Sequence, residues 1–502
     1  MPRAQFVEYD AASPAPRNAC TTNTRKAVLD KLQVWANDET TTKVYWLNGM
    51  AGTGKTTIAY SFSEILDEND SLGGTFFCSH LRADTRDVRC IIPTISFQLA
   101  HYFPLLSHLI MEVVKDHPDC SSWRIGKQFL NFMVKPLNAV DRDARGVLAV
   151  PVVVLDALDE CSDQFFVAEL LSVILKHSKS LPVKFFITSR PDAKLKETFD
   201  DSLGHSNFIL HEVEKEIVKA DIELYVTAYL HDKFNKPNWP SQAELKRLVD
   251  MCGIMFIYAA TVCKYVAQRG RSSMPRRLSD VVNSKLELTS GLNDPLHMLY
   301  ERILHAAYAH VNDGERLDID MVLTAVVYVY NPLSIAAISA LMQIEHTEAA
   351  LSSLHSLIYI PSESYMPISI FHASFYDFIS NQALSSKHYL DPCISHKSLS
   401  IQCLSLMKKE WSAKYVPYLA KRRCEEISEH LAYACGSWAF HYTYSDNPNG
   451  SAELKDFFQS HLLRWMDCLS ILGKLETAVH SLHKIGIWAN VSGFVAIDGF
   501  YL

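Results

Sequence analysis

The segment KVYWLNGMAGTGKTT, residues 43–57, holds residue types whose spacing suits the phosphates of a nucleotide. It follows the pattern G-x-x-x-x-G-K-[ST], in which glycines let backbone N–H groups close around a β-phosphate where a Cβ would clash. Lys55 is expected to reach the β- and γ-phosphates, and the Thr56 hydroxyl to bind Mg²⁺. The candidate nucleotide-binding residues of this loop are Gly49, Gly52, Thr53, Gly54, Lys55, Thr56 and Thr57.

The residues around the loop fit that prediction. Residues 44–47 are β-prone, and an apolar stripe at helical spacing starts at Ile58. A helix beginning at the end of the loop would point its positive end at the same phosphates. A strand, a glycine loop and a helix in this order predict nucleotide binding.

A phosphate loop also requires a carboxylate that orders the metal ion, at the end of a neighbouring strand. The run VVVLDALDE places Asp156 directly after four apolar residues, so we expect it to hold Mg²⁺ through water, opposite Thr56. The alternative is that Asp156 caps a helix that follows the strand.

The residue that activates the attacking water is less well defined. Fast P-loop ATPases commonly have a carboxylate directly after the metal-ordering Asp, but here that position is Ala157. Glu160 is our first candidate for the catalytic base and Asp159 the second, and either could instead cap the next helix. Because both are displaced along the chain, we expect slow hydrolysis.

A third strand, VKFFIT, ends in Ser189-Arg190-Pro191. An arginine at the tip of a central strand can donate a charge-assisted hydrogen bond to a γ-phosphate and so distinguish a triphosphate from a diphosphate. The alternative for Arg190 is an ordinary surface arginine on a loop.

Strands are predicted at 44–47, 74–78, 151–156, 183–188 and 207–211, with helices between them at 91–102, 126–137 and 165–177. Strands that alternate with helices indicate an α/β P-loop core with a parallel, doubly wound sheet and the ligand at the carboxyl ends of the strands. The alternation stops after residue 212. We predict helices at 217–232, 242–268 and 278–310.

Three helices (317–330, 335–343 and 346–357) and a β-ribbon (358–361 and 367–372) then indicate a winged helix. The rest is predicted to be mostly helical. The predicted domains are a loose leader (1–19), a nucleotide-binding domain (20–212), a helical domain (213–312), a winged-helix domain (313–385) and a helical C-terminal region (386–502).

The composition limits the class of protein. The chain has 502 residues, a net charge of −8 and 12 cysteines. The acidic balance argues against a dominant nucleic-acid surface, and we predict no nucleic-acid partner. Scattered cysteines and a polar start predict a cytoplasmic protein with free thiols. Residues 321–344 are uncharged, but Pro332 favours two short buried helices over a membrane span.

Three motifs together, GMAGTGKTT, VVVLDALDEC and FFITSRP, resemble the NACHT domain of the STAND class of signalling NTPases, and are most similar to the fungal NACHT proteins. The blocks IPTISFQLA, CGIMFIYAATVCKYV and FHASFYDFI are similar to further blocks of that group. The resemblance extends over about residues 20–380.

The resemblance implies an ATP/ADP-dependent switch with Mg²⁺, closed with ADP and open with ATP, whose opening permits self-association. It implies a role in nonself recognition or regulated cell death, with an unidentified protein trigger and effector. It further implies that Gly253 lies near the adenine, that His372 touches the β-phosphate of ADP, and that Arg25 borders the base. Family members often have glycine where Ala157 stands. Neither an output domain nor a sensor repeat is found within these 502 residues, so we expect a truncated or reduced regulator.

Three alternatives remain open at this stage. A turnover ATPase or kinase would need an acceptor pocket, which the helical modules do not suggest. A nucleic-acid-binding regulator would need Lys or Arg around 335–357, where the charged residues are Glu345 and Glu348, beside two histidines. A non-hydrolysing scaffold would keep nucleotide for stability alone. No guanine-recognition motif is present, so ATP is favoured over GTP.

Overall fold

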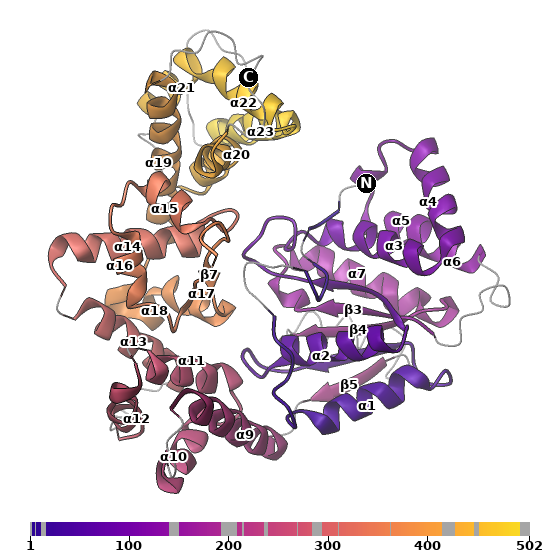
Figure 1. Cartoon of the computed structure of the whole chain (residues 1–502). Coiled ribbons are helices and arrows are strands. Elements are labelled where there is room, and N and C mark those ends of the chain that lie inside the picture. Colours follow the sequence, from indigo (N-terminus) through magenta and orange to yellow (C-terminus); the bar gives the residue numbers. More distant parts are fainter. Residues whose placement is uncertain are drawn as a thin grey trace. The chain divides into compact units, whose positions relative to one another are not determined.

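The structure is a computed structural model of the whole chain, shown in Figure 1. It describes residues 3–5, 7–11, 17–139, 150–191, 208–212, 215–234, 239–268, 270–283, 294–309, 311–361, 363–413, 427–445 and 451–491. The chain forms two compact units, Met1–Glu287 and Leu288–Leu502. The bounds of the five predicted domains differ from those of these two units, and the five domains stay a prediction.

A parallel five-stranded sheet forms the centre of the first unit, as predicted. Its order is β2-β3-β4-β1-β5, so β4 lies between the strand that precedes the phosphate loop and the strand that ends in Asp156. The strands are β1 (Val44–Asn48), β2 (Leu72–Phe77), β3 (Val152–Asp156), β4 (Lys184–Ser189) and β5 (Phe208–Glu212). Every residue of β1, β3 and β4 is buried, as expected for a parallel sheet covered on both faces.

Helices cover the two faces of this sheet. One apolar cluster joins the sheet to α1 and α2, and another joins it to α3, α5 and α7. The helix predicted at 126–137 is interrupted by a π-helical turn over Leu130–Val134. The helices are α1 (Lys26–Asn37), α2 (Lys55–Glu68), α3 (Ile91–Tyr102), α4 (Pro104–Asp116), α5 (Ile125–Phe129), α6 (Lys135–Ala139) and α7 (Gln164–His177).

A buried lysine joins β4 to the end of α1. The Lys184 side chain is fully buried, and Nζ donates hydrogen bonds to the backbone carbonyls of Trp35, Ala36 and Asp38, at 2.5, 3.0 and 2.8 Å. The last carbonyls of a helix have no partner within the helix, and a cation there also favours the helix dipole. Lys184 therefore satisfies the carboxyl end of α1.

The leader residues Val7 and Tyr9 contact β2. The backbone N–H of Phe77 donates to the carbonyl of Val7, at 3.1 Å, and Val7 is buried. On the same strand, the Gln98 amide accepts from the N–H of Thr75 and donates to its carbonyl, at 2.6 and 3.1 Å. A loose leader was expected over 1–19, whereas these residues pack against the sheet.

Four helices complete the first unit. The single helix predicted at 242–268 is two helices, because Gly253, at φ 58°, ends α10 and the chain turns before α11 begins at Phe256. The helices are α9 (Lys215–Phe234), α10 (Gln242–Cys252), α11 (Phe256–Ala267) and α12 (Met274–Val282). The predicted helix at 278–310 includes 284–293, which lie outside the described residues.

Among the residues that the structure describes, the regular elements of the second unit are helices and one antiparallel pair, β6 (Ile358–Tyr359) and β7 (Ser369–Ile370). Residues 321–344 are divided between two helices, as predicted. Within the described ranges, no helix is long and apolar enough to span a bilayer. The winged helix stays a prediction. The helices are α13 (Pro295–Tyr308), α14 (Asp313–Tyr328), α15 (Ile335–Met342), α16 (Thr347–Ser352), α17 (Ala373–Ile379), α18 (Gln382–Ser385), α19 (Pro392–Ala413), α20 (Glu429–Tyr444), α21 (Ser451–Ser460), α22 (Leu462–Ile471) and α23 (Leu475–Val491).

Candidate nucleotide-binding site

The phosphate loop connects β1 to α2. Gly52 and Gly54 have φ of +75° and +87°, a region that L-residues with a Cβ seldom adopt. Thr53 is buried, and its hydroxyl donates to the carbonyl of Met50, at 2.9 Å. Thr56 is exposed at the first turn of α2 and Thr57 is half-buried. The loop therefore has the strand, turns and helix start that its sequence predicts.

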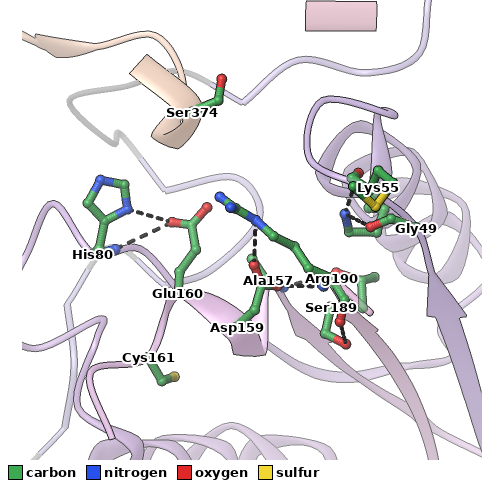
Figure 2. A network of polar contacts seen from close by, with 12 residues as sticks. Gly49, Lys55, His80, Ala157, Asp159, Glu160, Cys161, Ser189, Arg190 and Ser374 are labelled. Atoms are coloured by element: carbon green, nitrogen blue, oxygen red, sulfur yellow. Dashed lines mark hydrogen bonds and ion pairs between the residues drawn. The ribbon is translucent and has the colours of Figure 1, made fainter. Parts of the chain in front are cut away.

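Lys55 folds back over this loop. Nζ donates to the carbonyl oxygens of Gly49, at 2.6 Å, and Met50, at 3.0 Å (Figure 2). Burial lowers the pKa of Lys55, and the nearby Asp159 opposes that shift. A bound phosphate would offer this ammonium group a charged acceptor in place of the neutral carbonyls.

Asp156 lies at the carboxyl end of β3, separated from β1 by β4. Its Oδ1 accepts a hydrogen bond from the Thr188 hydroxyl of β4, at 2.6 Å, and the same hydroxyl accepts from the N–H of Ala157, at 2.9 Å. Thr188 thereby orients the carboxylate. It was not predicted from the sequence, although a polar residue near the end of an apolar strand is a signal that could have singled it out.

The surroundings of Asp156 fit a magnesium site. Burial raises its pKa to about 6, and hydrogen bonds from Thr188 and Thr56 oppose that shift. Oδ2 is buried without a hydrogen bond of normal geometry among the described residues. A buried carboxylate oxygen next to a threonine hydroxyl is the donor set of a Mg²⁺–nucleotide complex. Thr56 and Asp156 are the residues that would hold the ion. Its positive charge would offset the negative charge of the phosphates.

Ala157 has a left-handed backbone, with φ 54° and ψ 48°. For a residue with a Cβ this conformation costs about 1–2 kcal/mol, more than the extra entropy that glycine loses on folding.

We therefore expect Ala157→Gly to raise the free energy of unfolding by about 0.5–1 kcal/mol, measured by urea denaturation. Ala168→Gly, in the interior of α7, is the matched control and should lower it by about 1 kcal/mol. Equal destabilisation by both changes would contradict strain at Ala157.

The two candidate bases have different partners. They lie in a short 3₁₀ turn over Leu158–Glu160. Both oxygens of Asp159 face Arg190: Oδ1 accepts from its backbone N–H, at 2.9 Å, and Oδ2 lies 3.0 Å from Nε (Figure 2). Burial raises the pKa of Asp159, and Lys55 and Arg190 oppose that shift. Asp159 therefore orients the arginine that was predicted to contact a γ-phosphate.

Glu160 instead lies beside His80, a residue that the sequence did not single out. Its Oε2 is 3.1 Å from Nδ1 of His80 and 3.4 Å from the backbone nitrogen of His80 (Figure 2). The two residues are 80 positions apart, and no local pattern links them. Their proximity follows from the adjacency of β2 and β3.

Helix α11 contacts the phosphate loop directly, and α9 contacts Arg25, which reaches the same loop. The N–H of Ile257 donates to the carbonyl of Gly52, at 3.1 Å, and a Cβ on Gly52 would lie 2.1 Å from Cγ2 of Ile257. The Arg25 guanidinium donates to the carbonyl of Thr53, lies 4.6 Å from the ring centre of Phe256, and has Nε 3.8 Å from Oδ2 of Asp221. The structure thus places Arg25 at the loop.

The remaining two predicted residues are on separate units. Gly253 ends α10, four positions before Ile257, and a Cβ there would meet no atom within 4 Å. His372 is on the second unit, where Nδ1 accepts from the N–H of Ser374, at 3.1 Å, and caps α17. Its predicted contact with a β-phosphate is untested.

Comparisons with known proteins match one part of the chain to a family model. Residues 23–190, about a third of the chain, match the family model described as "Nephrocystin 3, N-terminal". No curated protein matches. A solved structure described as "Structure of Drosophila ORC bound to DNA" is similar with 12% identity, 73% of this chain and 97% of that chain covered, and a TM-score of 0.29.

The prediction of no nucleic-acid partner is wrong as an exclusion: the similar solved structure is described as bound to DNA. That prediction used the net charge of the whole chain, which does not describe a local surface. A TM-score of 0.29 is too low to argue for DNA binding by this chain. The predicted homo-oligomer and protein trigger and effector have no support in these comparisons.

Proposed function

We propose that this protein is an ATP/ADP-dependent switch of the NACHT/STAND class, with slow Mg²⁺-dependent ATP hydrolysis. The observation that carries the proposal is the contact between Gly52 and Ile257, because it joins the phosphate loop to a helix outside the sheet. A nucleotide that moves this loop would therefore also change the position of α11. A switch requires that two nucleotides bind two conformations with different affinities.

Each site residue has a role in this proposal. The loop from Gly49 to Thr57 holds the phosphates, and Lys55 turns from the loop carbonyls to the β- and γ-phosphates. Thr56 and Asp156 hold Mg²⁺. Arg190 exchanges part of its contact with Asp159 for the γ-phosphate of ATP, which ADP lacks. Glu160 is the base.

The domains proposed for the switch are those predicted from the sequence: nucleotide-binding (20–212), helical (213–312) and winged-helix (313–385), with a helical region beyond. Gly253 would lie near the adenine and His372 would contact ADP in the closed state. A role in nonself recognition or cell death is the corresponding proposal for the pathway, and it rests on the resemblance alone.

The test is the nucleotide content and turnover of the purified chain. We expect protein that retains ADP and hydrolyses ATP at no more than about one per minute, well below the 1–10³ s⁻¹ typical of enzymes. Lys55→Ala is the control, and should purify without nucleotide. Turnover at tens per second would contradict the switch, and wild-type protein that neither retains nor binds ATP or ADP would contradict nucleotide binding itself.

A further inference from the structure

The Glu160 carboxylate is held by a neighbour that comes from another strand. His80 follows β2, and its Nδ1 and backbone N–H both face Oε2 of Glu160, at 3.1 and 3.4 Å. An ionised carboxylate only accepts hydrogen bonds, so Nδ1 of His80 must carry the proton that is shared between them. Both side chains are 23% exposed, which leaves the pair within reach of water.

The backbone around His80 is fixed from both sides. Before it, the N–H of Cys78 donates to the carbonyl of Asp156, at 3.0 Å. After it, the carbonyl of Arg86 accepts from the N–H of Ser162, at 3.0 Å, and the Arg86 guanidinium donates to the carbonyl of His80, at 3.4 Å. The residues that precede and follow Glu160 therefore hold the loop that carries His80.

The side chain of Asp159 has a different partner from that of Glu160. Both of its oxygens are used by Arg190, and its side chain is 13% exposed. A move of Asp159 toward a water would break its contacts with the backbone N–H and the guanidinium of Arg190. Glu160 instead has its Oε2 against a histidine, which can donate to the carboxylate and hold its orientation.

We propose that His80 is a positioning residue for ATP hydrolysis, which orients the Glu160 carboxylate toward the attacking water. This inference rests on the proposed function. In the step concerned, a lone pair of the water oxygen forms a bond to the γ-phosphorus and a water proton passes to Glu160. The bond from the γ-phosphorus to the bridging oxygen breaks, and its electron pair leaves with ADP.

The test compares three substitutions at one position in the full chain. His80→Ala removes the donor and should lower kcat for ATP hydrolysis about 10- to 100-fold, because small misplacements of a reacting group cost that much, while KM for ATP stays within about twofold. In His80→Asn, the amide nitrogen stands near the place of Nδ1 and should restore most of kcat. In His80→Gln, the nitrogen stands near the place of Nε2 and should not.

A double-mutant cycle ties the effect to Glu160. In a Glu160→Gln background, His80→Ala should cause no further loss of kcat, because the base that it positions is gone. A full additional loss in that background would overturn the proposal, as would wild-type kcat in His80→Ala. If His80→Ala fails to fold, as judged by thermal melting, the contrast between His80→Asn and His80→Gln decides, and equal kcat in those two overturns the proposal.

Failure of the proposed function has a different outcome. Wild-type protein that binds ATP without any hydrolysis would overturn both the slow hydrolysis and the role of His80. Wild-type protein that hydrolyses ATP slowly, with His80→Ala equally active, would overturn the role of His80 alone. Retention of ADP by all four proteins, wild type included, is expected because His80 does not belong to the phosphate loop.

Discussion

Replacing Gly52 by alanine is expected to weaken ADP binding by about 100-fold or more. Gly52 has φ +75°, which costs a residue with a Cβ about 1–2 kcal/mol. The new Cβ would also lie 2.1 Å from Cγ2 of Ile257, so the loop and α11 must separate. Together these costs reach about 3 kcal/mol, and each 1.4 kcal/mol is a factor of ten in Kd. Titration with a fluorescent ADP analogue measures the change.

Two controls separate the clash from the backbone strain. Ile257→Ala removes Cγ2, the closest atom that the new Cβ meets, and leaves Cβ at 3.0 Å, so Gly52→Ala should cost less affinity in that background than in the wild type. Gly253→Ala has positive φ but nothing within 4 Å of its Cβ, and should lower stability with little effect on ADP affinity. An undiminished loss in the Ile257→Ala background would contradict a steric link between the loop and α11.

Replacing Lys184 by methionine is expected to lower the free energy of unfolding by about 3 kcal/mol. The substitution keeps the aliphatic stem but removes the donor to the carbonyls of Trp35, Ala36 and Asp38. The carbonyl of Asp38 keeps the N–H of Thr41 as a donor, at 3.2 Å, whereas those of Trp35 and Ala36 lose this donor. A buried acceptor left without a partner costs about 1–3 kcal/mol, and part of that cost is relieved where water can enter. Urea denaturation measures the loss.

The matched control for Lys184→Met is Lys26→Met, because Lys26 is an exposed residue at the other end of α1. That change should alter the free energy of unfolding by no more than about 0.5 kcal/mol. If Lys184→Met lowered the free energy of unfolding by no more than Lys26→Met, the hydrogen bonds from Lys184 would not be needed at the end of α1.

The sheet and the phosphate loop were predictable because their signals are local. The strands β1, β3 and β4 are mostly apolar over five or six residues, and the loop is a fixed spacing of glycines and Lys55. The break between α10 and α11 was missed because a single residue marks it. The apolar spacing of a helix continues across 253–255, and only the left-handed φ of Gly253 interrupts it.

The surroundings of the site could not be predicted in the same way. His80 meets Glu160 and Thr188 meets Asp156 because β2, β3 and β4 are adjacent in the sheet, in an order that is not the order of the sequence. The role of Lys184 was not predicted from the sequence, because its partners on α1 are nearly 150 positions away. Spacing along the chain reports such pairs only after the strand order is known.

The contacts along β2 have a consequence for how this sheet can associate. A terminal strand normally offers its N–H and carbonyl groups to another chain, which is a route to aggregation. Here Val7 and the Gln98 amide already occupy such groups on Phe77 and Thr75. Proteolysis that removed the residues around Val7 would expose the N–H of Phe77 to solvent. The segment around Val7 therefore limits the pairing of a further strand with the outer edge of β2.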